Sequence, residues 1–317
     1  MSISSRTALA WAPRWVILAA GLLAAVFLAI GLAVSWQLVQ TAGWSSGGVS
    51  WLPAMAALGV GSYTLRFLRW HLLARRVAPR LWLRPSLRIY MAGFAMGLTP
   101  GRVGEFCKFA LLRDETGVPE ARSAFVFPLE RATEATSFAG LAVAGAGLGH
   151  LGLGRLGLGV LGAIAALPAL ALIGLVLHRR RGGVAARGAW LRQMTHGIQS
   201  LVNPGALLLA LLCALAARCC DALLFWAAAS AVGVPLPLAG AALAFGLAGL
   251  AGGLLLLPAG VGAVEGSLVA TAAALGGDPA SALVAAVLAR CLTLWVWVPL
   301  GLWFAFRAST RPALVQP

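Results

Sequence analysis

Charge is scarce in this chain. Only 10% of its 317 residues are Asp, Glu, Lys or Arg, and Lys108 is the single lysine. Soluble domains usually carry about 25% charged residues, so the composition excludes an ordinary soluble protein. The sequence also lacks a G-x-x-x-x-G-K-[ST] phosphate-binding loop and an H-E-x-x-H zinc motif. These absences argue against ATP hydrolysis and against a metalloenzyme, so we expect no catalytic residues, no metal site and no cofactor.

Apolar residues are abundant instead, at 61% of the sequence. They form stretches long enough to cross roughly 30 Å of hydrocarbon, which takes about 20 helical residues. The sequence therefore predicts an all-α polytopic membrane protein. We expect six full spans: 15–39, 51–75, 122–149, 155–177, 205–232 and 280–306.

Two further apolar segments, 86–113 and 238–275, are interrupted by proline and glycine. In the first, about 13 residues precede Pro100, and a helix of that length reaches only ~20 Å. The second repeats this arrangement, with "LPAGVGAVEG" beginning at Leu257. Both segments are therefore predicted to be re-entrant hairpins of two half-helices.

The arginines predict the orientation. Seventeen Arg and Lys residues fall on the side of the N-terminus, including those of the predicted loops 69–88, 113–122 and 178–203 and of the C-terminus, and only Arg155 falls on the other side. By the positive-inside rule, both termini are cytoplasmic and the two hairpins enter from opposite faces. Segments 51–149 and 205–306, each a hairpin between two spans, are then inverted-topology repeats of a single membrane domain. Segment 178–203 between them is interpreted either as a basic amphipathic helix on the cytoplasmic surface or as an ordinary basic linker.

Ten ionisable residues are expected to lie at membrane depth. At about 2.5 to 3.5 kcal/mol for each unpaired charge at the bilayer centre, ten would cost about 25 to 35 kcal/mol, more than a fold can offset. They must therefore be paired, hydrated or bound to a ligand. Helical i,i+3 spacing predicts three pairs: Glu105 with Lys108, Arg131 with Glu134, and a structural pair of Arg218 with Asp221. Four residues have no local partner: Arg102, Glu130, Glu265 and Arg290.

A polar site between the repeats is the expected result. Glu130 and Glu134 share a helix face, so we expect Arg102 or Arg290 to lie near them. A half-helix that starts after Pro100 points its free N–H groups into the membrane, which favours an anion. Glu105 either pairs with this helix dipole or couples substrate or protons. The candidate substrate-binding residues are Arg102, Glu105, Lys108, Glu130, Arg131, Glu265 and Arg290.

Several segments together resemble the membrane domain of the lysylphosphatidylglycerol synthase/flippase family. They are "RFLRWHLLARR" from Arg66, "YMAGFAMGLTPGRVGEFCKFALLRDETGVP" from Tyr90, "ER" at Glu130, "LPAGVGAVEGSL" from Leu257, and Arg290. The second loop reads Pro-Ala-Gly where the family pattern is Pro-Gly-Gly. The resemblance implies movement of a lipid between leaflets, with aminoacylated phosphatidylglycerol or polyprenyl-linked lipids as substrates. Since only about 11 residues follow the last expected span, lipid synthesis is not expected.

The sequence thus favours a lipid flippase in the cell membrane whose partners are anionic membrane lipids, with no role for nucleic acid. Two other classes stay open. A secondary transporter of a small charged solute would use the same site but would be closed to the bilayer, and an intramembrane lipid enzyme is the third. The sequence is compatible with assembly into a homo-oligomer.

Overall fold

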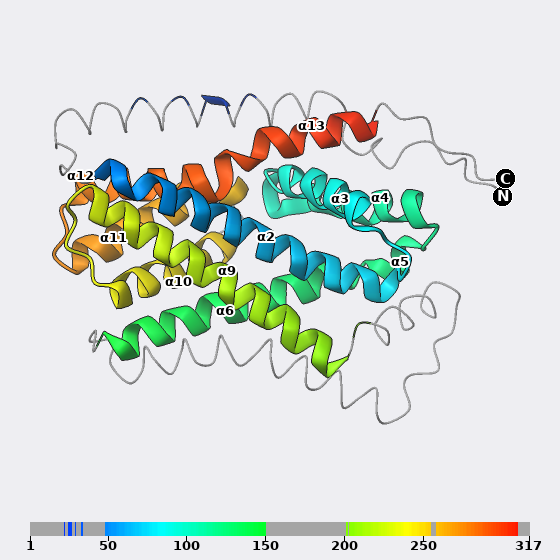
Figure 1. The fold of residues 1–317 in the computed structure, drawn as a ribbon, viewed down its shortest axis with the longest axis horizontal. Helices are drawn as coiled ribbons and strands as arrows, with labels where there is room; N and C mark the ends of the chain where they lie inside the picture. Colours follow the sequence, from blue (N-terminus) through cyan, green and yellow to red (C-terminus); the bar gives the residue numbers. More distant parts are fainter. Residues whose placement is uncertain are drawn as a thin grey trace.

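The computed structural model describes residues 48–149, 203–254 and 258–309, together with a few isolated positions. Every regular element in these ranges is helical, as Figure 1 shows. The expected spans 15–39 and 155–177 and the basic segment 178–203 lie outside the described ranges, apart from isolated positions and Asn203. The prediction of an all-α fold is confirmed for the part of the chain that can be described.

Within these ranges, four long helical segments run along the molecule. They are α2 (Leu52–Val77), α6 (Val126–Leu148), α9 (Pro204–Ala231), and α12 (Pro279–Arg290) continued by α13 (Trp297–Ser309). At 1.5 Å per residue each is at least about 34 Å long, enough to cross a bilayer core of ~30 Å. Within the described ranges, 204–231 and 279–307 are also apolar enough for a membrane span by composition. The other two carry more charged residues: α2 has four arginines, and α6 has Glu130, Arg131 and Glu134.

Two hairpins of shorter helices lie at opposite ends of these segments (Figure 1). The first consists of α3 (Leu83–Met96) and α4 (Cys107–Thr116), joined by the 3₁₀ helix η2 (Pro100–Phe106). The second consists of α10 (Leu238–Leu254) and α11 (Ala263–Ala274), joined by η3 (Pro258–Gly260). The tips η2 and η3 contact each other midway along the molecule. Two short helices, η1 (Gly48–Trp51) and α5 (Glu120–Ser123), precede α2 and α6.

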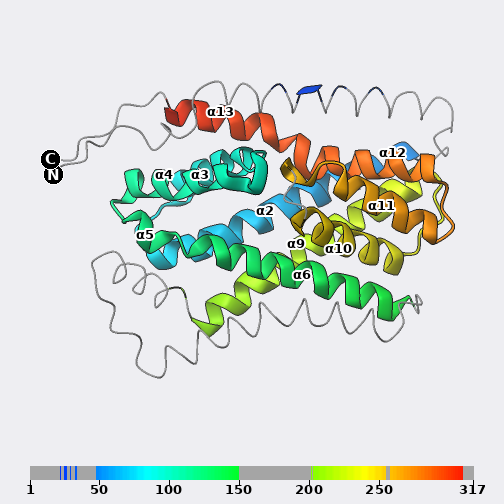
Figure 2. The same ribbon diagram turned by 180° about the vertical axis from the view of Figure 1, so that it is seen from behind.

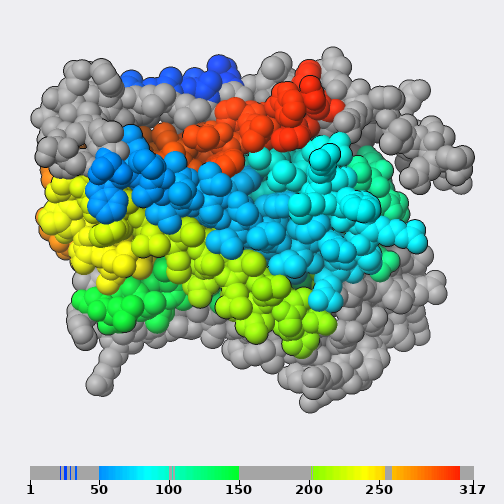
Figure 3. All heavy atoms as spheres, viewed as in Figure 1, coloured from blue at the N-terminus to red at the C-terminus, as the bar shows by residue number. Residues whose placement is uncertain are grey.

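The first helix of each hairpin packs against a long helix from the other half of the chain. Helix α2 packs along α9, α3 packs against α13, and α10 packs against α6. Figure 2 shows α6 beside α10 on one face, whereas α2, α9 and α13 make up much of the described surface in Figure 3. Glycines allow these close contacts: a Cβ at Gly145 of α6 would lie 2.4 Å from the backbone N of Leu243, and one at Gly301 of α13 would lie 2.5 Å from the carbonyl O of Met91. Small residues at helix crossings are typical of membrane bundles.

The boundaries of α9 and α12 follow from local chemistry. The Asn203 side chain accepts a hydrogen bond from the backbone N–H of Ala206 at 3.2 Å, and the Asp278 carboxylate accepts one from Ser281 at 2.8 Å. A proline follows each cap at the first helical position, where it has no intrahelical bond to lose.

The predicted span 280–306 is interrupted. A π-turn at Cys291–Trp295 separates α12 from α13, and the backbone N–H of Val296 bonds to the carbonyl of Cys291 at 3.0 Å. Sequence periodicity does not reveal this turn, because one extra residue in a helix leaves the apolar composition unchanged. The π-turn directly follows Arg290, and π-turns are frequent at functional sites.

Candidate functional site

The first hairpin tip is held by Thr99. Its hydroxyl donates to the carbonyl of Met96 at 2.9 Å and accepts from the backbone N–H of Gly104 at 2.7 Å. Gly104 has no room for a side chain, since a Cβ would lie 2.3 Å from the Met96 carbonyl. Between these positions Arg102 has φ of 57°, a left-handed conformation that few non-glycine residues adopt. The tip therefore fixes the backbone from which the Arg102 side chain extends.

The second tip is held by Arg290. Its Nε donates to Glu265 Oε1 at 2.7 Å and its Nη2 donates to the carbonyl of Ala259 at 2.7 Å. The other carboxylate oxygen of Glu265 accepts from the backbone N–H of Gly262 at 2.7 Å, which caps α11. Ala259 has φ of 52°, so each tip contains one left-handed non-glycine residue.

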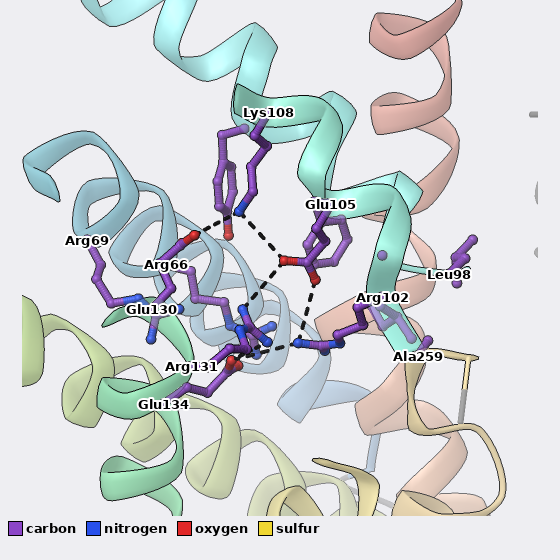
Figure 4. Close-up of a pocket in the computed structure, with 14 residues that line it drawn as sticks. Arg66, Arg69, Leu98, Arg102, Glu105, Lys108, Glu130, Arg131, Glu134 and Ala259 are labelled. Carbon is purple, nitrogen blue, oxygen red and sulfur yellow. Dashed lines mark hydrogen bonds and ion pairs between the residues drawn. The ribbon is translucent and has the colours of Figure 1, made fainter. Parts of the chain in front are cut away.

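A pocket lies beside the two tips (Figure 4), with an empty volume of ≈ 520 Å³ that includes the space at its mouth. Its wall is built from α2, α3, η2, α4, α6, the η3 tip and the π-turn. The lining residues are Arg66, Arg69, Tyr90, Phe94, Gly97, Leu98, Arg102, Glu105, Lys108, Glu130, Arg131, Glu134, Ala259 and Leu294.

The Lys108 ammonium is buried on one side of this pocket. Its Nζ lies 2.8 Å from Glu130 Oε2, and both side chains are almost fully excluded from solvent. The same Nζ lies 4.6 Å from the centre of the Trp70 ring, a cation–π contact. Gly93 makes room for the lysine, because a Cβ there would lie 2.1 Å from Lys108 Cγ.

Glu105 lies among three cations at longer range. Its carboxylate oxygens are 3.6 Å from Arg102, 3.6 Å from Lys108 and 3.7 Å from Arg131. Figure 4 shows these contacts as dashed lines converging on Glu105. At such distances the carboxylate balances charge without a short hydrogen bond to any of the three.

Glu134 is the carboxylate nearest Arg102 on α6. It contacts Arg131 at 2.6 Å and Arg102 at 3.8 Å. The expectation that Arg102 or Arg290 lies near the two glutamates of α6 is met by Arg102, whereas Arg290 pairs elsewhere. All three pairs expected from i,i+3 spacing are present, at 3.6, 2.6 and 3.0 Å.

Asp221 organises a second layer behind the pocket. This fully buried carboxylate contacts Arg66 at 2.7 Å and Arg218 at 3.0 Å, and it accepts a hydrogen bond from Ser62 at 2.6 Å. The Arg218 guanidinium lies over the Phe138 ring at 4.8 Å. The predicted Arg218–Asp221 pair is therefore part of a larger cluster that holds Arg66 at the pocket wall.

A family model for the transmembrane region of lysylphosphatidylglycerol synthase matches residues 14–301. The chain belongs to this family. The match includes both hairpins and every residue that lines the pocket. Comparison with curated proteins gives no match. Membership of the lysylphosphatidylglycerol synthase transmembrane family makes the chain a membrane protein and points to a function connected with membrane lipids.

Within this family member, the structure separates the seven candidate residues into two groups. Five line the pocket: Arg102, Glu105, Lys108, Glu130 and Arg131. Glu265 and Arg290 do not line it; they pair with each other at 2.7 Å behind the second tip. Glu265 has no partner nearby in the sequence, as expected, and its partner Arg290 comes from α12, 25 residues away.

Sequence reasoning missed two pocket arginines on α2. Arg69 was assigned to a cytoplasmic loop, but it lies within α2 with only 4% of its surface exposed. Arg66 lies one helical turn earlier and also lines the pocket. The available signal was their i,i+3 spacing in "RFLRW", which places both on one helix face. With these two, five cations and three carboxylates line the pocket, which gives it a net positive charge.

Proposed function

We propose that this protein is a lipid flippase, which moves an anionic lipid, aminoacylated or polyprenyl-linked, between the membrane leaflets. The observation that supports it best is the net positive pocket midway along the bundle, beside the contact between two hairpin tips. A phosphate is an appropriate ligand for such a pocket, because guanidinium groups bind phosphate oxygens with paired hydrogen bonds. The protein acts as a transporter and not as an enzyme.

The proposed architecture is an inverted repeat with two re-entrant hairpins. Repeat 1 is α2 to α6 and repeat 2 is α9 to α13. The exchanged contacts support this assignment, since the first hairpin helix of each repeat packs against the last long helix of the other. The presence of one left-handed non-glycine residue in each tip, Arg102 and Ala259, also supports it. Transporters with such repeats bind substrate near the bilayer midplane.

The proposed mechanism places only the head group in the pocket. Arg102, Lys108 and Arg131, together with the N-terminal end of the α4 half-helix, hold the phosphate while the acyl chains stay in the bilayer. Rocking of one repeat against the other opens the pocket to each leaflet in turn, and the contact between η2 and η3 is where the two repeats separate. Movement is downhill or coupled to an ion through Glu105, Glu130 or Glu265. In the proposed topology both termini are cytoplasmic and the protein lies in the cell membrane.

Reconstitution tests this function. The assay uses phosphatidylcholine vesicles that contain 10% fluorescent phosphatidylglycerol or fluorescent polyprenyl phosphate. Loss of the label from the outer leaflet is compared between vesicles with and without the protein. We expect wild type to accelerate exchange and Arg102→Ala to lower the rate about tenfold or more. Arg113→Ala, on the exposed end of α4 and outside the pocket, is the matched control.

Two results would reject the proposal. One is exchange at the rate of empty vesicles for every lipid. The other is equal exchange by wild type and Arg102→Ala. Uptake of a soluble anion by the same vesicles, without lipid exchange, would instead favour the secondary transporter.

A further inference from the structure

The charged residues inside the bundle do not balance. Seven cations and five carboxylates lie in or behind the pocket in the described ranges, which leaves an excess of two positive charges. The cations are Arg66, Arg69, Arg102, Lys108, Arg131, Arg218 and Arg290. The carboxylates are Glu105, Glu130, Glu134, Asp221 and Glu265.

Five of these cations have a short contact with a carboxylate oxygen, at distances from 2.6 to 3.0 Å. Two do not. Arg102 approaches Glu105 and Glu134 only at 3.6 and 3.8 Å. Arg69 makes no ion pair or hydrogen bond with any described residue, and its buried Nε atom has no acceptor. The five short contacts use four carboxylates, because Asp221 serves both Arg66 and Arg218. Glu105 has contacts only at 3.6 to 3.7 Å, and the cluster as a whole keeps an excess of two positive charges.

Both of these arginines line the pocket. Arg69 reaches it from α2 and Arg102 reaches it from η2, as Figure 4 shows. Only 4% of the Arg69 surface is exposed. A buried guanidinium without a partner is costly, so its presence beside a cavity indicates that a ligand supplies the missing anion.

We propose that the pocket takes a phosphoryl group with two negative charges, the head group of a lipid phosphomonoester, bound by Arg69 and Arg102. This inference rests on the proposed function and narrows its substrate. A phosphomonoester carries about −1.5 to −2 charges at pH 7 and three free oxygens, whereas a phosphodiester carries one charge. Only the monoester carries enough negative charge to neutralise both arginines.

The same charges disfavour aminoacylated phosphatidylglycerol. That lipid is a phosphodiester, and its amino group would enter a pocket whose carboxylates already face cations. Glu130 is engaged by Lys108 at 2.8 Å and Glu134 by Arg131 at 2.6 Å. A cationic head group would have to compete with these contacts.

Binding to the purified full chain in detergent tests the inference. Isothermal titration at pH 8, where the monoester is a dianion, compares dihexanoyl phosphatidate with dihexanoyl phosphatidylmethanol, which differs by one methyl group and one charge. We expect phosphatidate to bind at least about tenfold more tightly. Equal affinities would overturn the proposal. Inorganic phosphate is the third ligand. If it binds more weakly than phosphatidate, the pocket takes its phosphoryl group from a lipid, whereas equal binding of the two would overturn the proposal of a lipid ligand.

A substitution tests whether Arg69 causes the preference for phosphatidate. Arg69→Gln is expected to reduce the preference for phosphatidate to about threefold or less, whereas Arg113→Gln, outside the pocket, leaves it unchanged. An Arg69→Gln protein that is monodisperse and keeps the full preference would overturn the assignment. If that variant does not fold, the comparison of the two lipids on wild type still decides the question.

The vesicle assay separates this inference from the proposed function. Exchange of phosphatidylglycerol at the same rate as phosphatidate would reject the dianion preference but leave the flippase intact. Tight phosphatidate binding without exchange of any lipid would reject the flippase and leave the ligand class standing.

Discussion

The Nζ atom of Lys108 lies 2.8 Å from Oε2 of Glu130, and the two side chains are 3% and 1% exposed. Replacing Lys108 with methionine keeps a similar volume but leaves a buried carboxylate without its direct partner. We expect a loss of about 3 to 5 kcal/mol in unfolding free energy, measured by denaturant titration in detergent.

The double variant Lys108→Met with Glu130→Gln is the control for this prediction. Removing both charges removes the uncompensated carboxylate, so part of the lost stability should return. A double variant as unstable as the sum of the single variants would show that the two side chains do not interact.

Arg290 provides a second test, because it joins α12 to the other tip through Glu265 and the Ala259 carbonyl. Arg290→Gln should lower the unfolding free energy by about 3 kcal/mol or more, since it removes one partner of a buried pair. We expect Glu265→Gln to cost less, because an amide oxygen still caps Gly262. Equal losses in the two thermal unfolding curves would contradict this order.

Much of the fold was accessible from the sequence because its signals are local. Pro100 and Pro258 interrupt apolar runs, and a helix cannot continue through such breaks unchanged. The helices α9 and α10 begin within one residue of the expected positions 205 and 238. The pairs three residues apart follow from helix geometry alone.

Contacts between distant segments were not accessible in this way. Arg66 meets Asp221 across 155 residues, and Lys108 meets Glu130 from a different helix. No periodic pattern records which helix packs against which. Arg69 was misplaced for a related reason: a row of arginines at a helix end looks like a cytoplasmic boundary, whereas the helix continues to Val77 and buries the first of them.

The close packing of α6 on α10 predicts a difference between two glycines of α6. A Cβ at Gly145 would meet the backbone of α10 at 2.4 Å, whereas nothing lies within 4 Å of one at Gly147. Gly145→Ala should therefore destabilise the protein by about 1 to 3 kcal/mol, because neither backbone can move aside. Gly147→Ala should be neutral or slightly stabilising. Equal melting temperatures for the two variants would contradict the packing.

The Asp278 cap predicts a pH-dependent effect. Hydrogen bonds from the backbone and the hydroxyl of Ser281 lower the pKa of Asp278 below its ordinary value of 3.8. A carboxyl whose folded pKa is lowered stabilises the fold above the unfolded pKa, and this stabilisation is lost as the pH falls through the folded value. Asp278→Ala should therefore reduce the melting temperature at pH 7, with the difference shrinking below about pH 4. Asn203→Ala removes a cap that does not titrate, so its effect should not change in this way.

Ala259 and Arg102 both have positive φ, and this predicts opposite consequences for function. Left-handed backbone costs a non-glycine residue about 1 to 2 kcal/mol, and glycine avoids that cost while gaining freedom in the unfolded state. Ala259→Gly should raise the unfolding free energy by about 0.5 to 1 kcal/mol and retain lipid exchange, because the residue at 259 contributes no charge to the pocket and its carbonyl still accepts from Arg290. Arg102→Gly relieves the same backbone strain and also removes one of the two cations without a short contact. We therefore expect it to fold at least as stably as wild type but to exchange lipid about tenfold more slowly, so an Arg102→Gly protein with full exchange activity would remove Arg102 from the mechanism.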